Sequence, residues 1–396
     1  MNSMKLETVA AFLAIAFYSI GLIKDIRETS SFHEYFFGPV PFVVLIVVIG
    51  RLVWRGTQTD RAIAGSKQEK AQLESQLAIA TAELNDIRPL VAVFLPNSPT
   101  QADSFWMEFS DAVRSALQEK NYQPDIRTLK ADYSGQEQIS ELRRFRWDSV
   151  KAAIVSPADN TVIPELVKIL QGLGTNRRPV VVHDMAPDEA RRAFSGSNLS
   201  VNIVCVDNER GGWFAADTML AYWKDKNLSP PYKVVLVPGN KNHPHSRLRL
   251  SGFKSRMEEA RTDVRYYPTP DGGWTYQGAY RAMMELLDNE QELKECAAVH
   301  GIFACNDEMA IAVEDALANA KHKHPAFQET RIVGFDYTFI LRHAWKRKQN
   351  GLIFGTVNAM VGDQASKASD LIAELISGQT PWPTDRIVVP APVIKA

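Results

Sequence analysis

Three polar side chains follow apolar runs at points of the chain where a ligand could be bound. Asn306 follows VHGIFAC, Asp184 ends PVVVHD and Asp336 ends RIVGFD. An amide offers two donors and one acceptor, and a carboxylate accepts hydrogens from hydroxyl groups. Open α/β sheets bind ligands at the carboxyl ends of their strands, which is where these residues would lie. The alternative for each residue is a structural role, as a helix N-cap or in a turn.

Flat aromatic side chains accompany these polar groups. Phe105 and Trp106 follow a polar stretch after the first apolar run, and Trp274 lies in PDGGWTYQG, where two glycines favour an exposed loop. A sugar presents apolar C–H faces and a rim of hydroxyls, so its site needs flat rings beside amides, carboxylates and arginines. The alternative for these rings is burial in the core.

The segment NKNHPHSRLRL holds His243, His245, Arg247 and Arg249. A guanidinium can bind vicinal hydroxyls or a carboxylate through two hydrogen bonds. Two histidines are too few for a metal site and no further ligand follows at a suitable spacing, so we expect a solvated loop or the rim of a ligand site. The chain also lacks a G-x-S-x-G elbow, a P-loop and a zinc motif. We therefore expect no catalytic residue, no metal and no cofactor, in a protein that is not an enzyme.

The elements that would position these residues alternate between strand and helix. In 299–320 a short apolar run is followed by a polar turn and by a helix with two acidic residues in its first turn, and 106–119 is a second helical pattern. Strands are predicted in two series, at 90–95, 126–129, 152–155, 180–183 and 203–206, and at 233–237, 264–267, 301–304, 332–335 and 352–357. This alternation predicts an α/β fold of two doubly wound parallel-sheet lobes with right-handed crossovers.

Short motifs across residues 89–396 resemble those of the type I periplasmic sugar-binding proteins, ribose-binding protein and its relatives, which are related to the ligand-binding core of lactose-repressor-type regulators. They occur in the family's order: SPADN, PVVVHD, VDNERGG, RLRLSGF, IFACNDEMA with RIVGFD, and GTVNAMVGDQ. The resemblance implies a ligand held between two lobes that close by hinge motion. It also implies that the chain passes between the lobes near Asp207, Asn358 and Arg386. Lobe 1 would take about 89–206 and 359–386, and lobe 2 about 207–358 and 387–396.

The resemblance further implies which residues bind the ligand. Phe105 and Trp106 match the family's aromatic pair, Trp274 its stacking aromatic on the second lobe, and Arg247 its ligand-facing arginine, whereas Arg249 is equally well placed to be a surface charge. The full set of expected ligand-binding residues is Phe105, Trp106, Asp184, Arg247, Trp274, Asn306, Asp336 and Asn358.

Two positions depart from the family's pattern. Met185 follows Asp184 where many relatives have an arginine, and Asn358 or Ala359 replaces the glutamine usual after the last passage between lobes. These departures favour, over ribose, a ligand that needs fewer hydrogen bonds on that side, or a modified sugar, a polyol or a nucleoside.

Two uncharged segments, 8–23 and 35–50, predict transmembrane helices at about 7–23 and 35–54, which make residues 1–55 a membrane anchor. A cleaved signal peptide is the alternative for the first, and the second would still anchor the chain. Five basic residues within 51–70 favour both termini in the cytoplasm. Because the sugar-binding relatives are extracytoplasmic and the lactose-repressor relatives cytosolic, the side of the bacterial inner membrane that the binding domain faces stays open.

Residues 56–88 predict a helical linker. Leu73, Leu77, Ala80, Leu84 and Ile87 recur at spacings of four and three, as in a coiled-coil seam. The linker would be either a short parallel dimer stalk or a single spacer helix, and Pro89 would end it.

Composition and net charge limit the classes of binding partner. A chain of 396 residues with 45% hydrophobic residues can bury more than one core, and its net charge of −1 gives no support for a nucleic-acid partner. Cys205, Cys296 and Cys305 lack metal-ligand spacing, so we expect buried thiols.

The sequence thus predicts a membrane-anchored solute-binding protein that binds a sugar or sugar-like small molecule in an interlobe cleft. Its partner would be an ABC-type transporter permease, or a sensor kinase if cleft closure is passed through the linker and membrane helices, with a homodimer possible through the linker. A repressor is disfavoured because membrane segments occupy the place of a DNA-binding headpiece. A hydrolase or transferase is the third alternative.

Overall fold

The computed structural model describes residues 75–76, 88–97, 104–130, 133–174, 178–195, 197, 202–241, 243–289, 298–320, 325–327, 329–347, 351–379 and 385–394. The predicted membrane segments and nearly all of the predicted linker and dimer seam lie outside them. Among the described residues, no helix is both long enough and apolar enough to cross a membrane. Leu90–Phe145 and Lys151–Ala396 form one compact unit.

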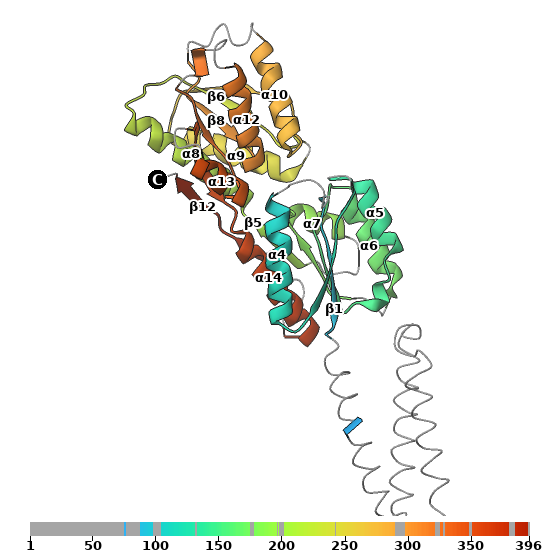
Figure 1. The fold of residues 1–396 in the computed structure, drawn as a ribbon. Coiled ribbons are helices and arrows are strands. Elements are labelled where there is room, and N and C mark those ends of the chain that lie inside the picture. Colours follow the sequence, from blue (N-terminus) through green and yellow to red (C-terminus); the bar gives the residue numbers. More distant parts are fainter. Residues whose placement is uncertain are drawn as a thin grey trace, which may run out of the picture. The chain divides into compact units, whose positions relative to one another are not determined.

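The first sheet of this unit is parallel throughout and defines lobe 1 (Figure 1). Its six strands lie in the order β11-β5-β4-β3-β1-β2. They are β1 (Leu90–Phe94), β2 (Gln123–Arg127), β3 (Ala152–Val155), β4 (Val180–His183), β5 (Asn202–Val206) and β11 (Asp385–Val388). The central strands β3, β4 and β5 are buried along their whole length, as expected of strands covered on both faces.

The second sheet defines lobe 2, with strands in the order β12-β10-β9-β8-β6-β7. They are β6 (Tyr232–Val237), β7 (Val264–Pro268), β8 (Gly301–Ala304), β9 (Arg331–Val333), β10 (Ile353–Asn358) and β12 (Ala391–Ile394). Only the edge strand β12 is antiparallel to its neighbour. The predicted α/β fold with two sheets is confirmed.

Helices cover both sheets. Those of lobe 1 are α4 (Ser104–Glu119), α5 (Gly135–Arg144), α6 (Val162–Gly172), α7 (Pro187–Phe194) and α14 (Val361–Ser377), with α4 and α14 side by side. Those of lobe 2 are α8 (Asn208–Asp225), α9 (Pro244–Glu259), α10 (Tyr276–Asp288), α12 (Asp307–Ala320) and α13 (Phe339–Arg347), with α8 paired to α9 and α10 to α12. Two short 3-10 turns are η1 (Trp147–Ser149) and η3 (Pro325–Phe327).

Two glycines explain why α8 and α9 pack so closely. A Cβ on Gly212 would lie 1.9 Å from the carbonyl oxygen of Arg249, and one on Gly252 would lie 1.9 Å from that of Glu209. Any side chain at either position would push the helices apart. The glycines of VDNERGG and RLRLSGF therefore fix the position of α9, which carries Arg249.

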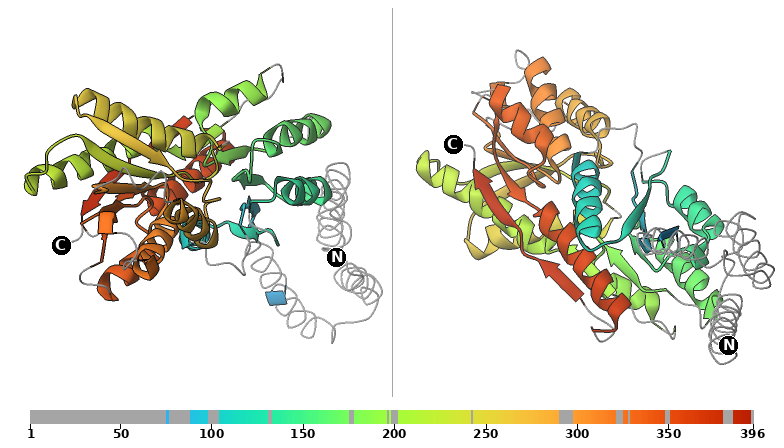
Figure 2. Two further views of the ribbon diagram at one scale, coloured as in Figure 1. Left: turned by 90° about the horizontal axis from the view of Figure 1, so that it is seen from above. Right: turned by 60° about the horizontal axis from the view of Figure 1, so that its bottom comes forward.

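The chain passes between the two sheets three times. It leaves lobe 1 after β5, returns after β10, and leaves again after Val388, two residues beyond Arg386, because β11 pairs with β5 up to that residue. The right-hand view in Figure 2 shows this last segment, coloured red, leading from α14 through β11 to β12.

Most predicted strands form within two residues of their expected bounds, and the exceptions are edge strands. β2 begins three residues before the predicted 126–129, and its Pro124 pairs only with β1. β12, which contains Pro392, and β11 were not predicted. Edge strands tolerate proline and lack a fully apolar pattern, so periodicity detects them poorly.

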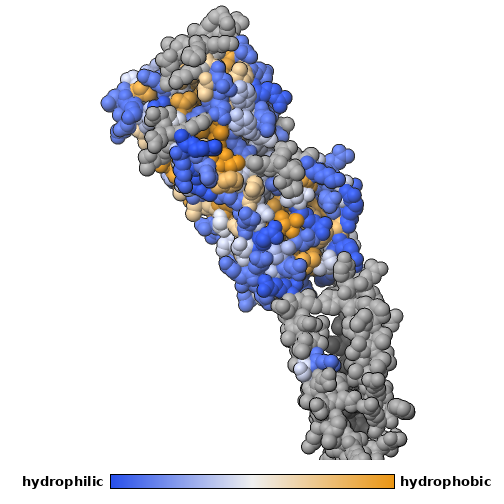
Figure 3. Space-filling view, in the orientation of Figure 1, coloured by the Kyte–Doolittle hydropathy of each residue, from blue (hydrophilic) through white to orange (hydrophobic). Residues whose placement is uncertain are grey.

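The surface of the described domain in Figure 3 is mainly hydrophilic. The large apolar side chains that are exposed are Met107, Ile387, Val389 and Ile394. Cys205 and Cys305 are buried free thiols, as predicted for them, and burial raises their pKa values to about 12 and about 11. Cys296 lies outside the described residues.

Candidate functional site

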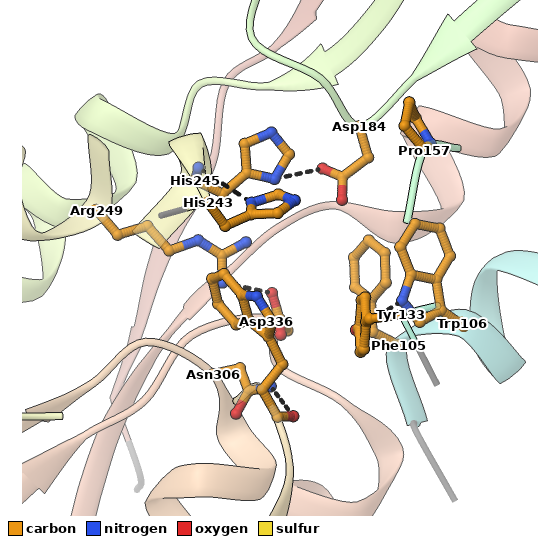
Figure 4. Close-up of a pocket in the computed structure, with 11 residues that line it drawn as sticks. Phe105, Trp106, Tyr133, Pro157, Asp184, His243, His245, Arg249, Asn306 and Asp336 are labelled. Carbon is orange, nitrogen blue, oxygen red and sulfur yellow. Dashed lines mark hydrogen bonds and ion pairs between the residues drawn. The ribbon is translucent and has the colours of Figure 1, made fainter. Parts of the chain in front are cut away.

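One cavity of the domain is lined by side chains from both lobes (Figure 4). The cavity has a volume of about 40 Å³. Its lining residues are Phe105, Trp106, Tyr133, Pro157, Asp184, His243, His245, Arg249, Trp274, Asn306 and Asp336. Six of the eight residues expected from the sequence are among them.

The first turn of α4 supplies the aromatic wall of lobe 1. Phe105 and Trp106 meet edge to face, with ring centroids 4.9 Å apart. The indole Nε1 of Trp106 donates to the Tyr133 hydroxyl at 2.9 Å. This bond satisfies the polar edge of the indole within the protein, so the ring offers the cavity mainly apolar surface.

Trp274 supplies the aromatic wall of lobe 2 and is held on several sides. Its backbone has φ 65°, directly after Gly273 at φ 62°. A Cβ on Gly239 would lie 2.5 Å from the indole, so glycine is needed there for the ring to lie flat on the backbone. The carbonyl oxygen of Trp274 accepts from Asn306 Nδ2 at 3.0 Å.

Asn306 combines the two roles left open by the sequence. Its Oδ1 accepts from the backbone N–H of Met309 at 2.9 Å, which is the N-cap of α12, while its Nδ2 fixes Trp274. The same side chain lines the cavity. These two bonds use one of its two donors and one of its two acceptor positions, so Asn306 both positions Trp274 and keeps hydrogen-bonding capacity for a ligand.

Arg249 lies in the cavity and is 5% exposed. Its Nε donates to Asn208 Oδ1 at 2.7 Å, its Nη1 donates to the Cys305 carbonyl at 2.5 Å, and Nη1 lies 3.5 Å from Asp336 Oδ1. The guanidinium also covers the ring of Phe335 at 3.7 Å. These contacts hold a positive charge beside Asp336 at the carboxyl end of lobe 2's sheet.

Arg249, and not Arg247 as expected, is the arginine that lines the cavity. Arg247 lies outside the cavity, with its side chain 52% exposed and bound to Glu189 at 2.8 Å. Two residues along a helix turn the side chain by roughly 200°, so only one of the pair can face the cleft.

Asn358 also lies outside the cavity lining. Its Oδ1 accepts from the backbone N–H of Met360 at 2.8 Å, and its backbone forms an isolated bridge with Asp336. Asn358 is therefore a turn residue where the chain returns to lobe 1, and it shapes the backbone next to the site.

Asp184 and two histidines meet where the lobes face each other. Asp184 Oδ1 lies 3.4 Å from His245 Nδ1. Burial opposes ionisation of Asp184, but the charges of His245, His183 and Arg249 outweigh it and lower the pKa of the carboxyl. His243 Nδ1 accepts from the backbone N–H of His245 at 3.4 Å, and burial, followed by the nearby His245, lowers the pKa of His243 to about 3.

Sequence reasoning assigned no ligand role to Arg249, Tyr133 or Pro157, and placed His243 and His245 either in a solvated loop or at the rim of a ligand site. A signal for the histidines existed: Pro244 is the first residue of α9, and proline is common at that position, which makes His243 the N-cap after β6. Tyr133 carries no comparable signal, because its place in the cavity depends on long-range packing.

Four of the nine non-glycine residues with positive φ in the described part of the chain line this cavity. Asp184, Trp274 and Asp336 have φ values of 53°, 65° and 106°. Such conformations cost non-glycine residues of order 1–3 kcal/mol each and gather at functional sites, where surrounding contacts impose them. Among residues of the cavity wall, positive φ is found at the two carboxylates, the stacking aromatic and Tyr133, which has φ 54°.

A family model described as a periplasmic binding protein domain matches residues 93–380, which is most of the chain. The chain belongs to this family. Among curated relatives, the HTH-type transcriptional repressor PurR of Haemophilus influenzae is 24% identical over 158 residues, and the ribose operon repressor of Escherichia coli is 25% identical over 158 residues. The match covers 40% of this chain and 40% and 41% of those proteins, so the chain spans about two fifths of their length.

Solved structures share the fold over nearly their whole length. A periplasmic solute-binding protein of an ABC transporter from Actinobacillus succinogenes, with bound D-allose, has a TM-score of 0.65 and 20% identity, covering 78% of this chain and 98% of that one. The Caulobacter myo-inositol binding protein, bound to myo-inositol, has a TM-score of 0.61 and 19% identity, covering 77% and 92%. At these identities the likeness shows the fold alone.

Proposed function

We propose that this domain binds a small, neutral, polyhydroxylated molecule, a monosaccharide or a polyol, in the cavity between its lobes, without chemical turnover. The observation that carries the proposal is the composition of the cavity wall. Aromatic rings from opposite lobes, Phe105 and Trp106 on one side and Trp274 on the other, flank the carboxylates of Asp184 and Asp336. Rings suit the C–H faces of a sugar, and carboxylates accept its hydroxyl hydrogens.

The charges of the wall favour a neutral ligand over an anion. Arg249 is already bound to Asn208, the Cys305 carbonyl and Asp336, so its charge is largely compensated. His243, with its pKa lowered to about 3, is neutral at physiological pH. Within the described part of the wall, an anionic ligand would thus meet two carboxylates, while the guanidinium of Arg249 is already paired with Asp336.

The test begins with full-length protein purified in detergent. Native mass spectrometry identifies small molecules retained by it, and titration calorimetry measures the affinities of D-ribose, D-allose, D-galactose, myo-inositol and D-galacturonate. We expect micromolar or tighter binding of at least one neutral compound and weaker binding of D-galacturonate than of D-galactose. Absence of binding by every neutral compound at millimolar concentration would refute the proposal.

The proposal extends to the membrane. The two uncharged segments before residue 55 support an anchor in the bacterial inner membrane, so the full-length chain should stay with membranes after a carbonate wash. Recovery in the soluble fraction would refute the anchor. Alkaline phosphatase and fluorescent protein fusions at the carboxyl terminus then decide the side, since the phosphatase is active only outside the cytoplasm.

Two roles follow from ligand binding, and the names of the solved relatives favour the first. The ligand is delivered to an ABC-type permease, as the name of the Actinobacillus protein implies for that protein. The second role, a receptor that signals to a sensor kinase through residues 56–88, is favoured by the heptad-like spacing of that segment. Uptake of labelled ligand in a deletion strain separates them, because a receptor's loss changes the response to the ligand and leaves uptake intact.

A further inference from the structure

Four polar side chains of lobe 1 form a buried hydrogen-bond network behind the cavity wall. They are Gln138, Ser156, His183 and Gln364, and all four are fully buried. They come from α5, from the ends of β3 and β4, and from the first turn of α14, and they lie outside the cavity lining. Buried polar groups are tolerated when each is paired, and a connected set of them fixes one arrangement of the elements that carry it.

Each bond of the buried network has a defined direction. Gln364 Nε2 donates to the Ala359 carbonyl at 2.6 Å, so Gln364 Oε1 accepts from His183 Nε2 at 3.1 Å. The hydrogen of the neutral imidazole is then on Nε2, and Nδ1 accepts from the Ser156 hydroxyl at 2.9 Å. Burial lowers the pKa of His183 to about 4, so the ring is neutral at physiological pH. One tautomer therefore satisfies every bond of His183.

The buried network supports the lobe 1 wall of the cavity from behind. The residue after His183 is Asp184, which lines the cavity, and the His183 ring lies edge-on to Trp106 with centroids 5.9 Å apart. Gln138 holds Pro157, another lining residue, on both sides. Its Nε2 donates to the carbonyl before Pro157 at 2.8 Å, and its Oε1 accepts from the N–H after Pro157 at 2.7 Å. The network thus holds two strand ends that continue into the cavity wall.

The buried network also reaches the segment where the chain returns from lobe 2. Ala359 lies between β10 of lobe 2 and α14 of lobe 1. Its N–H donates to the Asp336 carbonyl at 3.4 Å, and its carbonyl accepts from Gln364 at 2.6 Å. Asp336 lines the cavity from lobe 2, and Asp184 lines it from lobe 1. The backbones of these two residues are therefore joined behind the wall through Ala359, Gln364 and His183.

Segments that cross between lobes absorb the change of backbone conformation when a cleft closes. We infer that His183 and Gln364 are positioning residues, which hold Asp184 and the crossing at Ala359 in one arrangement and so set the affinity for every ligand without contacting any. Apparent affinity scales with the fraction of protein in the binding form, so loss of this link should weaken all ligands by the same factor. The inference rests on the proposed function, because one of its two readouts is ligand affinity.

Substitutions at His183 separate its two hydrogen bonds. His183→Gln places an amide about where Nε2 lies and keeps the bond to Gln364, whereas the shorter His183→Asn reaches only to the position of Nδ1 and keeps the bond to Ser156. Gln364→Leu removes both bonds of the Gln364 amide. The matched control is Ser369→Ala, because Ser369 is also fully buried on α14 but bonds only within its own helix, to the Ala365 carbonyl at 2.9 Å.

The measurements use full-length protein. Titration calorimetry with D-ribose, D-allose, D-galactose and myo-inositol gives the affinities. Hydrogen–deuterium exchange without ligand reports how often the backbone of residues 358–364 opens. Thermal unfolding without ligand confirms that each variant is folded.

We expect His183→Asn and Gln364→Leu to bind each probe that the wild type binds about 10-fold more weakly, by the same factor for every probe. The amides of residues 358–364 should exchange about 10-fold faster in both variants. The double variant should lose no more than the weaker single variant, since both changes break the same link. His183→Gln and Ser369→Ala should match the wild type in both measurements. A merely structural role would lower stability but leave the affinity of the folded protein unchanged.

The outcomes separate the inference from the proposed function. If no neutral probe binds the wild type at millimolar concentration, the proposed function and the statement about affinity both fail, and the exchange rates alone decide whether His183 and Gln364 hold the crossing. If a probe binds, but His183→Asn and Gln364→Leu keep wild-type affinities and exchange rates, only the inference is wrong. Equal weakening by His183→Gln and His183→Asn, or by Ser369→Ala, would also overturn it, because the bond to Gln364 would then not be the cause.

Discussion

The buried carboxyl group of Asp307, close to the site, should make the stability of the protein depend on pH. Asp307 is the first residue of α12 and is fully buried. Its carboxylate accepts from the Thr338 N–H at 2.7 Å, the Thr338 hydroxyl at 3.2 Å and the Thr356 hydroxyl at 2.6 Å. These bonds link the chain after β9 to β10, next to the strained backbone of Asp336. Burial nevertheless dominates and raises the pKa of Asp307 to about 7.

The size and sign of the effect follow from this shift. The carboxyl titrates near 3.8 when unfolded and about 7 when folded, a difference of about 3 units or about 4 kcal/mol. Because the folded-state pKa is raised, the stabilisation is fully present below pH 3.8 and is lost as pH rises through 7. Integrated between pH 5 and pH 8, the loss is roughly 2.5 kcal/mol.

Buried histidines act in the opposite direction and must be separated from Asp307. Burial lowers the pKa of His183 to about 4 and that of His243 to about 3. Their stabilisation is present above the unfolded value of 6.5 and is lost as pH falls, so it masks the Asp307 effect in the wild type. Comparison with Asp307→Asn, which resembles the protonated acid in shape, cancels the histidine contributions.

The assay is urea unfolding of wild type and Asp307→Asn, followed by tryptophan fluorescence at pH 5 and pH 8. Relative to the wild type, the free energy of unfolding of Asp307→Asn should rise by roughly 2.5 kcal/mol between the two pH values. The same difference between the proteins at both pH values would refute the argument, since it would mean that Asp307 does not titrate in this range.

Three further substitutions test how the cavity is built. Trp274→Ala should weaken ligand binding by about 2 kcal/mol, which is roughly 30-fold in Kd. Titrations measure this change, and thermal unfolding without ligand measures stability. If the folded variant binds the ligand as tightly as the wild type, the ring has a structural role only. Gly239→Ala should also weaken binding, because its Cβ would lie 2.5 Å from the Trp274 ring, whereas Gly172→Ala, with nothing within 4 Å, serves as control. Arg249→Gln should lower the free energy of unfolding by about 3–5 kcal/mol, because it leaves Asp336 buried without its cation. The exposed Arg247→Gln should lower it by at most about 1 kcal/mol. Equal losses would contradict the placement of Arg249 inside the cavity and Arg247 outside it.

The parts of the site that the sequence predicts are those set by strand ends. Asp184 follows β4 and Asp336 lies just beyond β9, so an apolar run that stops at a polar residue is enough to place them at the sheet edge. Trp274 was detectable because the adjacent glycines indicate a loop, and in the structure Gly273 and Trp274 both have positive φ. In each case the information is local.

The parts that the sequence did not predict depend on helix phase and long-range packing. Choosing between Arg247 and Arg249 requires the exact start of α9 and its rotation against α8, which the close contacts of Gly212 and Gly252 determine. Both glycines are visible in the sequence, but which helix each approaches is not. Likewise, Tyr133 lies in the cavity wall through contacts with residues far along the chain, the Trp106 Nε1 bond to its hydroxyl and its own N–H bond to the Pro96 carbonyl.

Contacts across the cleft suggest how binding and closure are coupled. Glu308 of lobe 2 accepts from the Ser104 N–H at 2.8 Å, at the first residue of α4, and Glu108 of lobe 1 accepts from the Phe339 N–H, at the first residue of α13. Each lobe thus places a carboxylate at a helix N-terminus of the other, where the helix dipole favours negative charge. A third contact across the cleft joins Arg247 to Glu189 at 2.8 Å.

None of the residues in these three contacts lines the cavity, so the contacts favour closure by the same amount for every ligand. Apparent affinity scales with the fraction of protein in the binding-competent form, so these contacts set the overall strength of binding. Selectivity must come from groups that bridge the lobes within the cavity. Asp184 of lobe 1, which lies 3.4 Å from His245 of lobe 2, is such a group, and a ligand that donates no hydrogen to it would leave the carboxylate with that contact alone in the closed form.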